Sequence, residues 1–257
     1  MTQKLAATEE RLDLDSLRQY NGSHKMRGAA AYMASTANGR ELARWIETGL
    51  NLLFPPHCVA CGQAGAWLCQ ACITSIPQVR PPICQHCGRP LAPAAQCSCA
   101  LGKSYLSGMR FVSPHVAPLR QAIHALKYDG VRVLTAPLAE LMASTWAWQN
   151  IAVDVVVPVP LNRLRQRQRG YNQSALLARR LAEHLALPIG DHLLVRERNT
   201  RSQVGLSAQE RWDNVWAAFG CPADQVVGQR ILLIDDDEDA RELTRRNLIL
   251  LPAAVIP

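Results

Sequence analysis

Long apolar runs are missing from this 257-residue sequence, and none reaches the roughly 18 residues that a membrane-spanning helix requires. The first residues, MTQKLAATEERLDLDSLRQY, are polar and mixed in charge, without the apolar core of a secretory signal peptide. We therefore expect a cytoplasmic protein. Hydrophobic residues make up 48% of the chain, which is enough for a small module plus one medium-sized domain.

Acidic residues are scarce in one region, between Leu161 and Arg211, where ten arginines accompany only four carboxylates. The whole chain carries a formal net charge of +7. A local basic field of this kind favours an anionic partner such as phosphate, a phosphorylated sugar or nucleic acid. The alternative is a solvated helical surface whose arginines form salt bridges, and the sequence leaves both possibilities open.

The composition divides the chain into three segments. Residues 1–39 are polar and lack apolar periodicity, so we expect a disordered or loosely helical extension. Residues 40–103 are expected to form a helix that ends at two prolines, followed by a cysteine-rich module. Residues 104–257 are expected to form an α/β domain, incomplete at its C-terminal end.

The α/β prediction rests on alternating strand and helix signals. Two short apolar runs, DVVVPV at 154–159 and RILLI at 230–234, are typical of strands buried on both faces of a parallel sheet. Ser207, followed three residues later by Glu210, predicts a capping box that opens a helix to Ala218. The order of elements favours a parallel sheet flanked by helices. The further expected elements are a strand at 108–112 and helices at 116–128, 133–148 and 171–187.

Eight of the nine cysteines lie within 42 residues and form two quartets. Each quartet contains Cys-x2-Cys pairs, in which a tight turn lets two thiolates bind one metal ion, and four thiolates form a tetrahedral site that suits Zn²⁺. A segment this small cannot bury enough apolar surface to fold without a metal. We therefore predict one or two structural zinc ions. Their ligands are Cys58, Cys61, Cys69 and Cys72 in the first quartet, and Cys84, Cys87, Cys97 and Cys99 in the second.

Several alternatives to this assignment remain open. The second quartet ends in a narrower Cys-x-Cys pair, so the number of zinc ions is undecided. Disulfides are disfavoured in a chain without a secretory signal, whereas an iron–sulfur centre fits four thiolates chemically. His57 and His86 are candidate substitute ligands, and Cys221 is expected to be a lone buried or half-buried thiol.

Six blocks of sequence occur in an order that resembles one bacterial protein family. They are FPPHCVACG, LCQAC, HALKYDG at 124–130, DVVVPVPLNRLRQRQRGYNQSALLA at 154–178, TRSQVGLSAQERWDNVWAAF at 200–219 and ILLIDD at 231–236. The chain resembles the ComF/GntX family, in which a zinc finger precedes a domain like the type I phosphoribosyltransferases. The resemblance implies that fold and a role in natural competence or the use of external DNA. It also implies single-stranded DNA or proteins of the competence machinery as partners.

The same resemblance implies a site for phosphoribosyl pyrophosphate (PRPP). In type I phosphoribosyltransferases two acidic residues at a strand end hold the ribose hydroxyls of PRPP, which binds with Mg²⁺, and Asp235 and Asp236 occupy those positions. The residues expected to contact pyrophosphate or phosphate are Lys127, Pro158, Val159, Pro160, Arg163, Arg165, Arg169 and Asn172. Lys127, Asn172 and the arginines have simpler explanations: a helix C-terminus for Lys127, a helix cap for Asn172 and a solvated loop for the arginines.

The family pattern fails directly after Asp236. The family continues into a Thr-Thr-Gly-x-Thr phosphate loop, but this chain continues Asp-Glu-Asp-Ala-Arg from residue 237. Three added carboxylates each repel a phosphate by about 1 kcal/mol in water and by several in a partly dry cleft. Micromolar binding amounts to only about 8 kcal/mol, so we expect impaired PRPP binding. The alternative is an active Mg²⁺-dependent phosphoribosyltransferase with an unknown acceptor.

The segment ILLIDDDEDARELTRRNL also resembles the start of a response-regulator receiver domain. That function needs a phospho-acceptor aspartate on a later strand, which this chain lacks, so we reject it. For the C-terminal segment we expect a helix over about 239–250 and a short strand at 253–256. A frameshift or truncation near codon 237 is our hypothesis for its origin.

Overall fold

The computed structural model describes residues 55–99, 107–148, 151–198, 200, 205, 207, 210, 213–214, 216, 218–221, 226–235 and 246–255, the last of these through the backbone alone. The chain divides into two compact units, residues 1–56 with 64–66 and the remainder. The fold described below belongs to the second unit. The extension predicted at 1–39 and the helix predicted before Pro55 lie outside the described residues.

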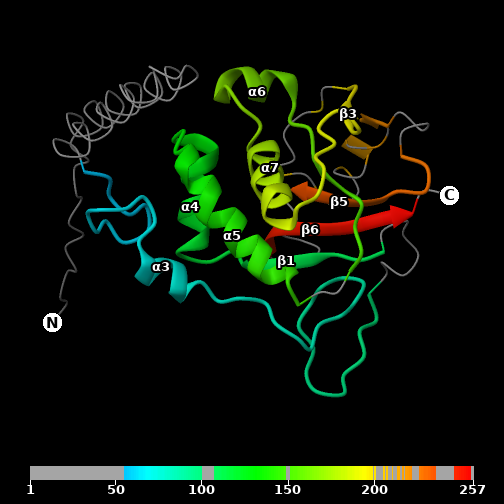
Figure 1. The fold of residues 1–257 in the computed structure, drawn as a ribbon, viewed down its shortest axis with the longest axis horizontal. Coiled ribbons are helices and arrows are strands. Elements are labelled where there is room, and N and C mark those ends of the chain that lie inside the picture. Colours follow the sequence, from blue (N-terminus) through cyan, green and yellow to red (C-terminus); the bar gives the residue numbers. More distant parts are fainter. Residues whose placement is uncertain are drawn as a thin grey trace, which may run out of the picture. The chain divides into compact units, whose positions relative to one another are not determined.

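A four-stranded sheet forms the centre of this unit (Figure 1), with the order β1, β6, β5, β2. Its strands are β1 (Arg110–Pro114), β2 (Val155–Pro158), β5 (Arg230–Asp235) and β6 (Arg246–Val255). β2 and β5 are parallel, as the two apolar runs predict, and β6 is antiparallel to both of its neighbours. The sheet is therefore mixed rather than parallel throughout. A separate pair of short antiparallel strands consists of β3 (Val195–Arg196) and β4 (Phe219–Gly220).

Helices supply the apolar partner that the sheet requires. They are α4 (Leu119–Tyr128), the 3₁₀ turn η2 (Arg132–Leu134), α5 (Thr135–Trp146) and α7 (Gln173–Leu185), with α3 (Gln70–Ser75) in the cysteine-rich segment. The three helices predicted here are confirmed, with their ends shifted by at most three residues. Within the described part of the chain, no helix is long and apolar enough to cross a membrane.

The main core joins the cysteine-rich segment to the α/β domain. Its fully buried side chains come from the helices and the central strands, namely Leu119, Leu126, Leu134, Leu138, Met142, Leu177, Leu181, Val156, Leu232 and Ile234. Cys58, Leu68 and Ile76 belong to the same cluster. The first cysteine quartet is thus built on a core that it shares with the helices.

The C-terminal segment differs from the prediction. Residues 246–250, expected to end a helix, begin strand β6, and the strand predicted near residue 253 is the end of the same strand. A short apolar run such as Leu248–Leu251 fits a buried strand as well as a helix, so periodicity could not decide. Pairing with β1 and β5 makes this segment a strand, so it adds a strand to the sheet that we expected to be shorter. Residues 236–245 lie outside the described residues.

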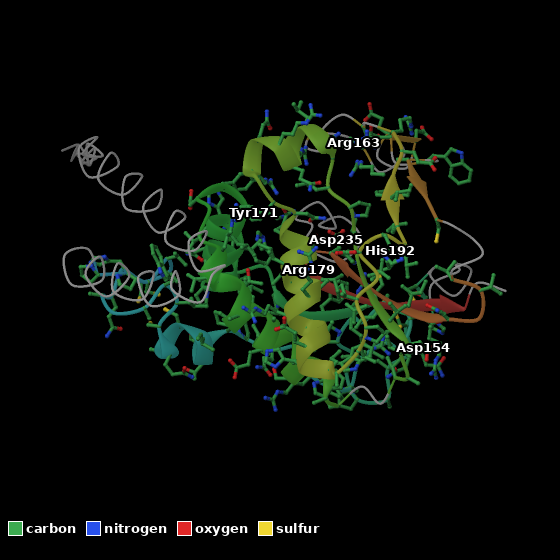
Figure 2. The ribbon with its side chains drawn as sticks, turned by 45° about the horizontal axis from the view of Figure 1, so that its top comes forward. Asp154, Arg163, Tyr171, Arg179, His192 and Asp235 are labelled. Carbon is green, nitrogen blue, oxygen red and sulfur yellow. The ribbon has the colours of Figure 1, made fainter. Side chains whose placement is uncertain are left out.

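Two carboxylates with different surroundings lie near opposite ends of β5: Asp154, which directly precedes β2, and Asp235, the last residue of β5 (Figure 2). At its start, Arg230 donates to Asp154 from Nε (2.9 Å), Nη2 (2.6 Å) and the backbone N–H (2.8 Å). These bonds lower the pKa of Asp154 to about 2. Because an unfolded aspartate titrates near about 4, this pair stabilises the fold above that pH, and the stabilisation is lost as the pH falls towards 2. Asp235 lies at the other end, where β5 leaves the sheet.

The predicted capping box is confirmed. The Ser207 N–H donates to Glu210 Oε2 (2.8 Å), and the Glu210 N–H donates to Ser207 Oγ (3.3 Å). The predicted helix is too long, because Trp216 lies in a turn and Ala218 is not helical. The Ala218 carbonyl accepts instead from the Glu197 N–H (3.0 Å), which begins the approach of β3 to β4.

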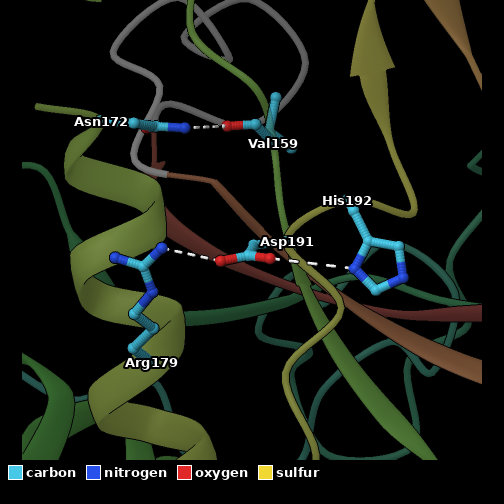
Figure 3. Close-up of polar contacts among 5 residues, drawn as sticks. All are labelled: Val159, Asn172, Arg179, Asp191 and His192. Atoms are coloured by element: carbon cyan, nitrogen blue, oxygen red, sulfur yellow. Dashed lines mark hydrogen bonds and ion pairs between the residues drawn. The ribbon is translucent and has the colours of Figure 1, made fainter.

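Asn172 fixes the start of α7 on the sheet. Its Oδ1 accepts from the Ser174 N–H (3.0 Å), which makes it the N-cap, and its Nδ2 donates to the Val159 carbonyl (3.0 Å; Figure 3). The neighbouring Tyr171 hydroxyl donates to the Leu126 carbonyl at the end of α4. Two adjacent side chains thus hold α7 against both β2 and α4.

We predict that Asn172→Ala lowers the free energy of unfolding by about 1 to 3 kcal/mol, because a cap and an inter-element hydrogen bond are lost together. Asn172→Ser keeps an oxygen for the cap but lacks the amide donor, so its stability is expected to lie between those of the wild type and Asn172→Ala. Urea unfolding followed by circular dichroism measures both. An alanine variant as stable as the wild type would contradict this role.

Candidate functional site

The first cysteine quartet has the geometry of a mononuclear metal site. The Sγ atoms of Cys58, Cys61, Cys69 and Cys72 all lie within 4.8 Å of one another, and Cys61 Sγ is 3.6 Å from Cys69 Sγ. Tetrahedral zinc with bonds of about 2.3 Å places its sulfur ligands about 3.8 Å apart, whereas a disulfide bond is about 2.05 Å long. The four thiols therefore fit one zinc ion and exclude the disulfide alternative.

Local structure sets these ligands in place. Gly62, at φ +77°, closes the turn after the first pair, and its N–H donates to the Cys58 carbonyl (2.8 Å). Cys69 precedes α3, and Cys72 lies in that helix. Burial opposes ionisation of Cys58, but donation from the N–H groups of Cys69, Cys61 and Ala60 lowers its pKa to about 6. Burial and the adjacent thiols raise the pKa of Cys72. A divalent cation would offset the repulsion between such thiolates.

The second quartet has equivalent geometry despite its narrower Cys-x-Cys pair. Cys84 Sγ is 3.7 Å from Cys99 Sγ, Cys87 Sγ is 3.6 Å from Cys97 Sγ, and all four sulfurs lie within 4.8 Å of one another. The turn needs glycine at residue 88, where φ is +65° and an added Cβ would meet the Met109 carbonyl oxygen at 2.5 Å. Two quartets thus fit two zinc ions.

Strand β1 holds the second quartet. The Arg110 side chain is buried and donates to the Gln85 carbonyl (2.7 Å), to Gln85 Oε1 (2.7 Å) and to the Met109 carbonyl (2.9 Å). Met109 N–H donates to the His86 carbonyl (2.7 Å). A small apolar cluster covers the same junction and consists of Val79, Ile83, Cys84, Cys87, Met109 and Phe111.

Three further candidates, His57, His86 and Cys221, are not metal ligands in either cluster. His57 and His86 are exposed, and neither belongs to a metal-binding cluster among the described residues. Cys221, predicted to be buried or half-buried, is exposed. It follows the short strand β4, which leaves its side chain at the surface.

Three of the residues predicted to face pyrophosphate, Pro158, Val159 and Pro160, lie at the carboxyl edge of the parallel pair. The Val159 N–H donates to the Ile234 carbonyl (2.9 Å), which places the loop after β2 beside Asp235. Pro158 ends β2, and Pro160 accepts from Arg196 Nη1 (3.5 Å). The structure thus brings Asp235 and the 158–160 loop together, while Asp236 lies outside the described residues.

The arginines after this loop form a helix, α6 (Arg163–Arg169), and not the loop that was the simpler alternative. Asn162 caps it, accepting at Oδ1 from the Leu164 N–H (2.9 Å). Gly170, at φ +77°, ends it. An asparagine before and a glycine after the arginine run are start and stop signals that would have predicted this helix from sequence.

Aromatic rings lie beside the end of this helix, and the sequence did not single out Tyr128. Arg169 donates from Nη1 to Gln173 Oε1 (2.9 Å), and its guanidinium carbon lies 4.8 Å from the centroid of the Tyr128 ring. The guanidinium carbon of Arg132 lies 4.4 Å from the centroid of the buried Tyr171 ring. Lys127 is buried in the last turn of α4. Cationic and aromatic groups from α4, η2 and α6 therefore meet here.

The arginines of α7 behave differently from those of α6. Arg179 Nη2 lies 2.7 Å from Asp191 Oδ2, and the same carboxylate is 3.9 Å from His192 Nδ1 through Oδ1 (Figure 3). The Arg179 side chain lowers the pKa of Asp191. Arg180 pairs with Glu183 at 2.8 Å. The salt-bridged surface that the sequence left open is thus found on α7.

Comparison with known proteins assigns the family. The chain is 30% identical over 178 residues to "Competence protein F" of Haemophilus influenzae, a match that covers 66% of this chain and 77% of that protein. The chain belongs to the ComF family. Residues 49–101 match the family described as "Double zinc ribbon domain", and both cysteine quartets fall within them. This agrees with the sulfur geometry and favours zinc over iron–sulfur chemistry.

Two further relatives carry related names. The chain is 31% identical over 176 residues to "DNA utilization protein YhgH" of Salmonella typhimurium, covering 66% of this chain and 77% of that protein. It is 26% identical over 181 residues to "Competence protein ComFC" of Bacillus subtilis, covering 66% and 71%. The resemblance found from sequence blocks is therefore confirmed at the level of the family.

We predict two zinc ions per chain, measured by plasma mass spectrometry after gel filtration in metal-free buffer. Cys61→Ser removes a ligand of the first quartet, and Cys97→Ser removes one of the second, so each is expected to lose about one equivalent. Cys221→Ser is the control, because this exposed thiol belongs to neither cluster. Zinc content near one in the wild type, or unchanged in either ligand variant, would contradict the two-site assignment.

Proposed function

We propose that this protein acts in the uptake or use of external DNA, and that it contacts single-stranded DNA through α6. The names of its relatives, competence and DNA utilization proteins, support the general role. In this proposal, the two zinc sites are structural, because four thiolates leave no open coordination position for a substrate. Thiolate clusters of this kind suit a reducing compartment, so we place the protein in the cytoplasm.

One observation carries the DNA-binding proposal. Arg163, Arg165 and Arg167 are exposed on α6, and no carboxylate pairs with them in the part of the chain that the structure describes. Residues 160–172 contain no acid at all. Arginines that lack internal partners bind the phosphates of a nucleic acid backbone and release its counterions.

The carboxyl edge of β2 and β5 supports a transferase-like origin. For PRPP the family resemblance implies two acidic residues at a strand end and a second loop that faces the pyrophosphate. The position of Asp235 beside the 158–160 loop supports this proposal. The acidic run from residue 237 replaces the phosphate-binding hydroxyls and glycine. We therefore propose a phosphoribosyltransferase-like domain with impaired PRPP binding. An active Mg²⁺-dependent transferase is the second candidate, favoured by the Asp235–Asp236 pair.

The DNA proposal is tested with a fluorescent dT12 oligonucleotide and anisotropy at several salt concentrations. A triple variant, Arg163→Ala, Arg165→Ala and Arg167→Ala, is expected to bind at least 10-fold more weakly near 50 mM salt. Its slope of log K against log salt is expected to fall by about 2, since each single-strand phosphate contact contributes about 0.7.

The matched control is the double variant Arg179→Ala and Arg180→Ala, which removes two exposed arginines that already pair with carboxylates. It is expected to change the slope by less than half as much, because paired arginines release few counterions. Equal effects of the two variants, or undetectable binding by the wild type, would contradict the proposal.

A further inference from the structure

A strip of exposed side chains runs from α6 along one side of α4. Arg120, His124 and Tyr128 are all exposed and follow one another at four-residue spacing, so they lie on one helix face over about 12 Å. Arg169 connects this strip to α6, because its guanidinium lies over the Tyr128 ring. The strip therefore continues the basic surface of α6 as a line of cationic and aromatic groups.

Tyr128 is the large exposed aromatic group on this strip. Its relative exposure is 57%, although it is the last residue of a helix whose other face is buried in the core. The His124 ring lies 4.7 Å from it, centroid to centroid, at 46°. Arg169 is held by its bond to Gln173, so a fixed guanidinium covers part of the ring while the rest faces solvent.

The strip carries an excess of positive charge, which favours binding of a polyanion. Residues 116–134 contain a single carboxylate, that of Asp129, whose Oδ2 lies 3.7 Å from His124 Nδ1. Arg120, Arg132 and Arg169 supply three cations on the same stretch and on the end of α6. Aromatic rings between arginines are the combination by which single strands are bound, through base stacking and phosphate contacts.

We propose that Tyr128 is a base-stacking platform, on a single-stranded DNA path that runs from α6 past Tyr128 and His124 to Arg120. This rests on the proposed function and adds to it the recognition of bases. A single strand exposes the faces of its bases, whereas a duplex keeps them stacked inside, so this path selects single strands. Arg169, fixed over the ring, holds a positive charge beside the phosphate that flanks the stacked base.

The test compares labelled dT12 with an abasic dodecamer that has the same phosphates but no bases. The wild type is expected to bind dT12 about 5- to 100-fold more tightly than the abasic strand. Tyr128→Ala is expected to remove this preference without changing the salt slope, whereas Tyr128→Phe keeps the ring and the preference. Trp216→Ala is the matched control, since Trp216 is also an exposed aromatic at 64% exposure.

A dT12 preference that survives in Tyr128→Ala, or that disappears in Trp216→Ala instead, overturns the inference. Tighter binding of rU12 than of dT12 overturns the assignment to DNA. This test can fail while the proposed function holds. If the α6 triple variant loses DNA binding and Tyr128→Ala still prefers dT12, only the stacking inference is rejected.

Photocrosslinking of the wild-type protein to a 5-iodouracil oligonucleotide is independent of folding defects in a variant. Crosslinks are expected on the peptide that contains Tyr128.

Discussion

Four-thiolate coordination is the constraint on which the rest of this structure depends. The segment from Cys58 to Cys99 contains only one short helix, α3, among its described elements, so its shape is set by the two sulfur clusters. Neither cluster is an appendage. Cys58 belongs to the core of the α/β domain, and the second quartet is bound to β1 through the buried Arg110, which donates to Gln85. Loss of metal would therefore loosen an edge of the sheet as well as a surface module.

The arginines of α6 and those of α7 have different electrostatic surroundings. On α7, Arg179 and Arg180 form ion pairs with carboxylates of the same chain. On α6, a seven-residue helix between an asparagine cap and a glycine, the arginines project from a stretch without acids. Four of the ten arginines in the basic region thus lie on one short helix. This helix follows directly from the loop beside Asp235, so the carboxyl edge of β2 and β5 adjoins the basic surface.

Features determined by local chemistry were predictable from sequence. Cysteine spacing gave both metal clusters, and the two apolar β-branched runs gave β2 and β5. The Ser207–Glu210 capping box was equally local. Features that depend on distant partners were not predictable: β6 is a strand because β1 and β5 pair with it, and Tyr128 gains its importance from Arg169, 41 positions later. The helix α6 was missed although its cap signals are local.

We propose that this protein binds nucleic acid through α6 of a domain that has two structural zinc sites and impaired PRPP binding. Native mass spectrometry of the full chain, mixed with dT12, PRPP and Mg²⁺ at equal concentrations, tests it in one measurement. We expect a protein species that carries two zinc ions and one oligonucleotide, and no species with bound PRPP. A PRPP–Mg²⁺ adduct on a chain that carries no oligonucleotide would contradict it.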